Sequence, residues 1–199
     1  MTDDAGLLSA SAAGDTGAFE LFMRRHQACV SRYLQSYTGS PDVDDAVQDT
    51  FVAAWRGAAG YRGSDSARAW LYAIARHTVH HQVRRRVDEP AELESIEQLA
   101  EQAGWGSLPE VPVEPDAEQW REVLHTAMSR LPPDEREVLT LRELDGFSGD
   151  ETATILQISV AAMKSRLHRA RIHLAAIVRT LEPDWHRESA PSPRTGATS

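Results

Sequence analysis

Residues 148–171 read SGDETATILQISVAAMKSRLHRAR, and this stretch decides the expected fold of the C-terminal half of the chain. Ser148 followed by Glu151 is a capping box, in which each side chain can bond the other residue's backbone N–H at a helix start. That helix is expected to reach Leu156. Only three residues separate it from a second helix, which Ser159 can cap. Two helices joined by so short a turn predict a helix-turn-helix.

The second helix of this pair has one apolar face and one basic face. A helix that enters the DNA major groove needs arginines that reach guanine bidentately, with lysine and serine to hold phosphates. A solvated basic face on an ordinary bundle is the alternative, and the capped helix and tight turn upstream make it the less favoured one. We therefore expect DNA contacts from this helix, with the candidates Ser159, Lys164, Ser165, Arg166, His168, Arg169 and Arg171.

Helical spacing of apolar residues continues upstream of this motif and through the N-terminal half. In the C-terminal half, one helix is expected to stop at Pro132-Pro133 and the next to run over 134–144. In the N-terminal half, three helices are expected, capped by Asp15, by Ser40 with Pro41 at the first helical position, and by Ser64 or Ser66. The prediction is an all-α protein.

Charge divides the chain into parts. The net charge is −9, yet residues 87–118 carry ten acidic residues and no basic one, and four prolines. This strip predicts an extended acidic linker between two mildly basic helical domains. The expected organisation is a flexible N-terminus (1–15), a first domain (16–86), the acidic linker (87–118), a second domain (119–181) and a disordered tail (182–199).

Composition excludes several classes of protein. Apolar residues make up 41% of the chain, but no run of eighteen of them exists, so we expect no membrane insertion. The first residues lack the pattern of a signal peptide. Cys29 is the single cysteine, which leaves no internal disulfide and no cysteine zinc cluster. A soluble cytoplasmic protein is expected.

Four segments resemble the extracytoplasmic-function (ECF) group of sigma-70 family RNA polymerase sigma factors. Residues 158–171 resemble its promoter-recognition helix, and residues 131–148 resemble the segment that precedes it. Residues 44–56 resemble its polymerase-binding helix, and residues 70–76 resemble the start of the helix that reads the −10 element. Four such segments in the right order and spacing are far more specific than a helix-turn-helix alone.

The resemblance implies a division of labour. The first domain would bind the clamp helices of core RNA polymerase and read and melt the −10 element, and the second would sit on the polymerase flap and read the −35 element. An anti-sigma protein is a further candidate partner. The resemblance assigns polymerase binding to Asp45, Gln48, Asp49, Phe51 and Trp55. It assigns −10 DNA to Tyr61, Arg62, Tyr72, Arg76, His77, Arg84 and Arg85, and −35 DNA to the seven candidates above.

Two alternatives remain at this point. A stand-alone helix-turn-helix regulator would explain residues 119–181, but neither the segment at 44–56 nor the acidic strip. A metalloenzyme could use His77, His80 and His81, but no carboxylate joins them in a metal motif and an arginine run follows. We expect no catalytic residue, metal or cofactor. For the linker, a simple spacer and an acidic peptide that threads the basic polymerase channel are both open.

Overall fold

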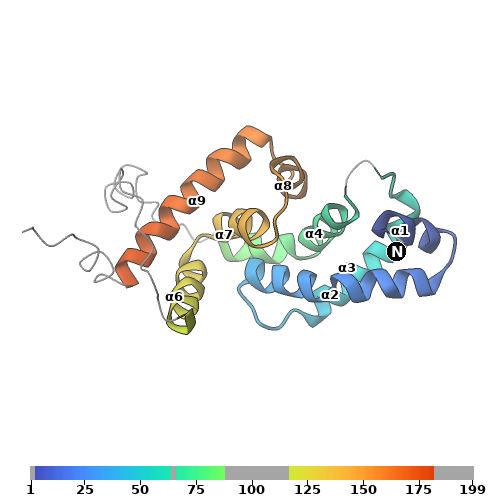
Figure 1. The fold of residues 1–199 in the computed structure, drawn as a ribbon, viewed down its shortest axis with the longest axis horizontal. Helices are drawn as coiled ribbons and strands as arrows, with labels where there is room; N and C mark the ends of the chain where they lie inside the picture. Colours follow the sequence, from blue (N-terminus) through green and yellow to red (C-terminus); the bar gives the residue numbers. More distant parts are fainter. Residues whose placement is uncertain (1–2, 64–65, 88–116, 182–199) are drawn as a thin grey trace, which may run out of the picture. The chain divides into compact units, whose positions relative to one another are not determined.

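The computed structural model describes residues 3–63, 66–87 and 117–181, and over these ranges it is helical without a strand (Figure 1). The all-α prediction is confirmed. The elements are α1 (Asp4–Ala12), α2 (Thr16–Thr38), α3 (Asp44–Gly57), η1 (Ala58–Gly60), α4 (Ala67–Val87), α6 (Ala117–Arg130), α7 (Pro133–Leu139), η2 (Thr140–Leu144), α8 (Gly149–Leu156) and α9 (Val160–Leu181).

The described residues form two compact units. The first holds α1 to α4, α7, η2, α8 and α9 as far as Ala170, and the second holds α6 and α9 from Arg171 onward. No described helix is long and apolar enough to cross a membrane. The expected linker and tail fall on residues 88–116 and 182–199, outside the described residues, apart from residues 87, 117 and 118, which belong to α4 and α6.

Several helix starts are the ones that side-chain chemistry predicts. The Asp15 carboxylate accepts a hydrogen bond from the Ala18 amide at 3.0 Å, which satisfies an unpaired N–H of the first turn of α2. At α8 both halves of the capping box are present, with Ser148 and Glu151 bonding each other's backbone at 2.9 and 3.2 Å. The Ser159 hydroxyl caps α9 in the same way.

Two expectations about the N-terminal half are wrong. The first residues are not a flexible leader, because residues 4–12 form α1, which packs on α2 with Leu7 and Leu8 buried. Ser40 does not cap the next helix: α3 begins at Asp44, with Val43 buried at its cap position and no side-chain cap. Burying Val43 fixes the entry of the chain into α3, while Asp44 and Asp45 stabilise the positive end of the helix.

The core of the first unit is continuous across its elements. From α2 the largest buried side chains are Phe22, Tyr33 and Leu34, and from α4 they are Leu71 and Tyr72. The later elements add a second set, namely Val138, Leu139, Leu141, Phe147, Ile155 and Leu156. Since α7 packs on α2 and α8 packs on α4, the helix-turn-helix segment completes a core that the N-terminal helices begin.

The helix expected over 134–144 is interrupted. It is α-helical to Leu139 and then widens into the π-helical turn η2, which ends at Leu144. A π turn places one extra residue in the ladder and rotates the residues that follow, and such turns are frequent at functional sites. Here the turn sets Asp145 and Phe147 against α2 and α4.

Candidate functional site

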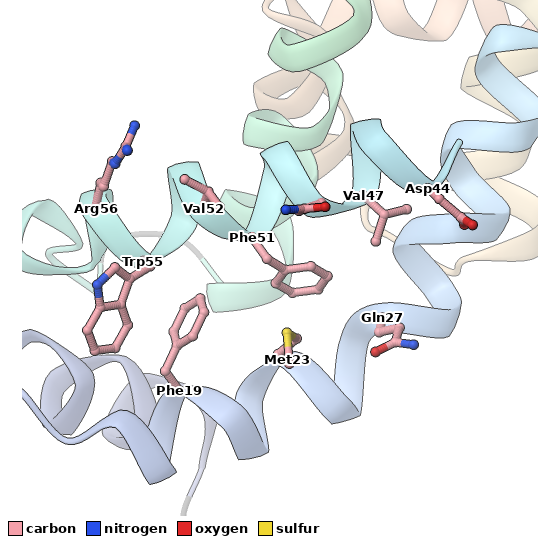
Figure 2. A pocket seen from close by; sticks show the side chains of 10 residues that line it. Phe19, Met23, Gln27, Asp44, Val47, Phe51, Val52, Trp55 and Arg56 are labelled. Carbon is pink, nitrogen blue, oxygen red and sulfur yellow. The ribbon is translucent and has the colours of Figure 1, made fainter. Parts of the chain in front are cut away.

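An apolar groove of about 890 Å³ lies between α2 and α3 (Figure 2). Phe19, Met23 and Gln27 line it from α2. From α3 it is lined by Asp44, Val47, Gln48, Phe51, Val52, Trp55 and Arg56. The groove therefore combines apolar walls with a polar and charged rim, which is the usual composition of a protein-binding surface.

The floor of the groove is aromatic and partly open. The Phe19 ring meets Trp55 edge-on at 5.0 Å and Phe51 at 6.5 Å between ring centroids. Phe51 is buried, as expected from the sequence, but Trp55 is 36% exposed and Val52 39%. Trp55 lies on the same apolar stripe of α3 as Phe51, and this spacing predicts that both are packed. For Trp55 the prediction is wrong, because the indole contacts Phe19 and otherwise stays accessible. Large aromatic surface left open next to charged residues is a common feature of protein-binding surfaces.

Beside the groove, the polar candidates on α3 face outward. Gln48 lines the groove, whereas Asp45 and Asp49 are exposed on α3 outside its lining. Arg56 points away from α2 at the far end of the groove (Figure 2). The surface thus offers carboxylate, amide and guanidinium groups within about three turns of one helix.

The face of α4 that carries Tyr72 and Arg76 is covered by other parts of the first unit. Tyr72 is fully buried, and its ring meets the Phe147 ring edge-on at 4.8 Å. Arg68, one turn before Tyr72, lies over the Phe147 ring at 4.2 Å and over the Tyr72 ring at 5.5 Å. Burial raises the pKa of the Tyr72 hydroxyl, with the Asp145 carboxylate adding to the shift and Arg68 opposing it.

Two buried carboxylates face this helix. Glu137 of α7 accepts hydrogen bonds from Arg76 Nε at 3.0 Å and from the Tyr33 hydroxyl at 2.6 Å. Asp145 accepts from Arg32 at 2.7 Å, and a terminal nitrogen of Arg68 lies 3.8 Å from the same carboxylate. Neither carboxylate side chain is exposed to solvent.

The remaining −10 candidates differ in their surroundings. Tyr61 is half-buried and its ring lies 5.4 Å from Trp70, while Arg62 and His77 are exposed. Trp70 is half-buried, in keeping with the core position that its spacing favours. The side chains of Arg84 and Arg85 lie outside the described part of the chain, although the helix itself continues to Val87.

The outer face of α9 presents the residues expected there. Met163, Leu167 and Ala170 are buried. Ser159, Lys164, Ser165, His168, Arg169 and Arg171 are exposed on the other side of the motif. Arg166 is the exception, because its Nε lies 3.4 Å from the Asp134 carboxylate of α7 and its side chain is 21% exposed. Arg166 is thus held by an ion pair within the first unit.

Comparison with known proteins decides the family. Residues 22–88 match the family described as "Sigma-70 region 2", and residues 121–174 match "Sigma-70, region 4". Proteins named "ECF RNA polymerase sigma-E factor" are similar over most of the chain. Those of Salmonella typhimurium LT2 and Escherichia coli K12 are each 34% identical over 163 residues, which covers 79% of this chain and 85% of the relative. The chain belongs to the ECF group of sigma-70 factors.

Further relatives agree with this assignment. The sigma-E factor of Haemophilus influenzae Rd is 30% identical over 175 residues, which covers 86% of this chain and 92% of the relative. The solved structure of CnrH in complex with the cytosolic domain of CnrY is 28% identical, with a TM-score of 0.62, and covers 89% of this chain and 97% of that one. The chain is therefore an RNA polymerase sigma factor that directs transcription initiation. A stand-alone regulator is not favoured, since both regions match.

Two histidines of this sigma factor have side-chain partners in the structure. The His80 ring bonds the Tyr37 hydroxyl at 3.0 Å, and His26 bonds Asp4 of α1 at 2.7 Å. Within the described ranges, no group of three or more histidine, cysteine or acidic residues lies close enough to hold a metal ion.

Several residues that line the groove or contact α4 were not among the candidates from the sequence. Phe19 and Met23 were not assigned to any site from the sequence, yet they form one wall of the groove. Arg68 was missed although it precedes Tyr72 and Arg76 at four-residue intervals, a spacing that places all three on one helix face. Glu137 and Asp145 carried no local signal, because their partners lie more than 60 residues away in the sequence.

Proposed function

We propose that the groove between α2 and α3 is the surface by which this sigma factor binds core RNA polymerase, through the clamp helices. The observation that carries this proposal is the accessible indole of Trp55 above Phe19 and Phe51, next to exposed acidic side chains. An aromatic anchor in a preformed groove is typical of an interface hot spot. Asp45 and Asp49 at the rim then set the charge of the partner, which must be basic there.

The second part of the proposal concerns promoter DNA. The face of α4 with Arg68, Tyr72 and Arg76, together with Tyr61, Arg62, His77, Arg84 and Arg85, reads and melts the −10 element. Aromatic rings and arginines on one surface are the groups that hold an unpaired strand. The outer face of α9 reads the −35 element, with Arg169 on a base and Lys164 on a phosphate. The polymerase flap supports this second domain.

The proposal also covers location and regulation. The factor acts in the cytoplasm, where polymerase and promoters are found, and contributes binding surfaces with no catalysis of its own. CnrH was solved with the cytosolic domain of CnrY bound. We infer that this sigma factor is likewise held by a regulatory protein of the anti-sigma kind, which competes with polymerase for the open groove.

The test of the polymerase surface is a charge reversal beside the groove. Asp49→Arg should weaken binding to core polymerase by about tenfold or more, since a like charge placed against a basic partner costs several kcal/mol. Asp42→Arg is the matched control, because Asp42 is equally exposed but lies before the start of α3, outside the helix that carries the polymerase-binding candidates. Titration of labelled factor with core enzyme measures the affinity, and circular dichroism checks the fold. Equal affinities for the two variants would remove Asp49 from the interface.

A further inference from the structure

Helix α8 starts with a glycine that its backbone conformation does not require. Gly149 is the first residue of α8, and its φ lies outside the left-handed region in which glycine is favoured. Alanine is the better residue in a helix, because it loses less backbone freedom on folding. The capping box of Ser148 and Glu151 already fixes this helix start. The reason for a glycine at this position is therefore the space around it.

That space is occupied by Met163 of α9. A methyl group on the Gly149 Cα would stand 3.2 Å from the Met163 Cε. Carbon atoms pack best at about 3.5–4.0 Å, so a side chain at residue 149 would press on Met163. Met163 is 2% exposed, and protein interiors leave few voids into which its methyl could move. The absence of a side chain at Gly149 thus allows α8 and α9 to approach this closely.

The other buried residues of α8 lie on the same side of the helix as Gly149. Thr152 and Ala153 are buried one turn later, and Leu156 is buried at the end of the helix. Positions i, i+3, i+4 and i+7 form one face of a helix. The buried face therefore begins with its smallest residue and ends with its largest, and Met163 packs against the end with the smallest residue.

The contact with Met163 lies at the end of α8 that is opposite to the turn. At the C-terminal end of α8 the chain turns into α9 through Gln157, which has a left-handed φ of 56°. Eight residues of α8 place Gly149 roughly 12 Å from that turn. The turn alone would let α9 tilt about one point. A second contact at this distance from the turn fixes the angle between the two helices.

The residues proposed to bind the −35 element follow Met163 along α9. Lys164 is the next residue, and Arg169 lies six residues after Met163, roughly 9 Å farther along the helix axis. Both are exposed. A tilt of α9 about the turn would therefore move Arg169 farther than Met163. A bidentate contact between arginine and a base depends on geometry, and binding groups must be held to within about 0.5 Å to be effective.

We propose that Gly149 is a positioning residue for −35 recognition. Its missing side chain lets Met163 hold α9 at the angle from which the outer face of this helix reads the −35 element. Gly149 acts through Met163 and not through a DNA contact of its own. The inference rests on the proposed −35 role of α9, and it adds to that role a residue of the preceding helix.

The test is Gly149→Ala, which adds the methyl group that would press on Met163. Holoenzyme made with the full-length variant is titrated with a promoter mapped from transcription start sites and with its single −35 substitutions. The affinity ratio between the original promoter and its weakest −35 substitution should fall by about threefold or more, because the base contacts are misplaced. Circular dichroism should show unchanged helical content. A residue that only supports the fold would instead weaken all these promoters alike.

Two further variants make the result specific to this contact. Gly60→Ala is the matched control, since Gly60 belongs to the helical turn η1 and a methyl group there would meet nothing within 4 Å. Its affinity ratio should equal that of the unchanged factor. Gly149→Ala combined with Met163→Leu is the rescue, because leucine ends one atom before the Met163 Cε and keeps nearly the same volume. The double variant should recover most of the original ratio.

The outcomes separate this inference from the proposed function. A Gly149→Ala factor that keeps the full ratio overturns the positioning role, and so does a loss that Met163→Leu does not repair. Loss of helical content in Gly149→Ala also contradicts it, because the proposal requires α8 and α9 to stay folded and to change only their angle. If the unchanged factor has no preference among the −35 substitutions, the proposed −35 role of α9 is wrong and the inference falls with it.

Discussion

Helices α4 and α9 both carry basic side chains. Two arginines of α4 are covered by other parts of the chain, and most of the basic side chains of α9 are exposed. Arg68 and Arg76 of α4 lie against buried carboxylates and an aromatic ring, whereas Lys164 and Arg169 of α9 remain exposed. Both helices bury apolar residues on one side and carry several arginines among the others, so the presence of arginines alone does not distinguish them. The difference comes from what the remainder of the chain places opposite each face. A basic helix face can therefore bind a partner only where tertiary contacts leave it exposed.

The largest expected effect comes from removing one charge at α4. Arg76→Ala leaves Glu137 buried without its cation, which costs about 3–5 kcal/mol in such sites. The Ser36 and Thr140 hydroxyl oxygens lie 2.8 Å apart, so cysteines can be introduced at both positions. We expect the effective concentration of the Ser36→Cys and Thr140→Cys thiols, measured by disulfide exchange with glutathione, to fall by roughly a hundredfold or more. Arg169→Ala in the same background should leave that value unchanged, because Arg169 is exposed.

The pair of partners provides the control for this effect. Arg76→Met combined with Glu137→Leu removes both charges and keeps the volume, an exchange that is often neutral or stabilising. The effective concentration of the two introduced thiols should then return to the original value or exceed it. A double variant that stays as open as Arg76→Ala would show that the ion pair is not what holds α4 and α7 together.

On α9 the expected effect is smaller and concerns DNA instead of closure. Arg169→Ala should cost about 1–3 kcal/mol and relax the preference at one base of the −35 element. Lys164→Ala is its counterpart, and should weaken all −35 variants alike while the salt dependence falls by about one ion. Binding of holoenzyme to a set of promoters with single −35 substitutions, at several salt concentrations, separates the two. A uniform loss with Arg169→Ala would assign Arg169 to a phosphate.

The smallest expected effect is a pH dependence that only the α4 contact should show. Glu137 faces Tyr33 from α2 and Arg76 from α4, with Arg166 of α9 also acting on it, and its pKa is raised by burial. Glu137 therefore holds its proton more strongly when α7 packs on α2 and α4 (the closed state) than when this contact is open. Closure is favoured most below the ordinary pKa of the carboxyl and weakens as the pH rises through the raised value.

Spin labels at two exposed sites, Gln35 on α2 and Thr154 on α8, can follow this opening by distance measurement. Glu137→Gln should flatten the pH profile, because the amide cannot titrate. A profile that is equally steep in Glu137→Gln would assign the dependence to another group.

Local chemistry made most of the fold predictable. Asp15, Ser148 and Ser159 cap the helices that they were expected to cap, because capping depends on residues within one turn. The outward face of α9 followed from its period. The start of α3 could not be predicted in this way. Ser40 and Pro41 form a good local signal for a helix start, but the burial of Val43 overrides it. Tertiary packing routinely prevails over a propensity of about 1 kcal/mol.

The site was predictable in part for the same reason. Phe51 could be placed because its position follows from the stripe of one helix, but the exposure of Trp55 depends on Phe19 of another. The burial of Tyr72 depends on Phe147, 75 positions later in the chain. Periodicity gives the direction of a side chain, and it carries no information on what a distant segment brings to meet it.

The long sequence separation within the α4 contact also fixes an order of events during synthesis. Helices α1 to α4 are complete once Val87 has left the ribosome, and they can pack on one another at that point because domains form from the N-terminus. About seventy residues separate Arg76 from Asp145, so the acidic partners are made roughly 3–14 seconds later at ordinary rates of translation. Each newly made molecule therefore passes through a short interval in which Arg32, Arg68 and Arg76 are uncovered, because the residues that contact them have not yet been made.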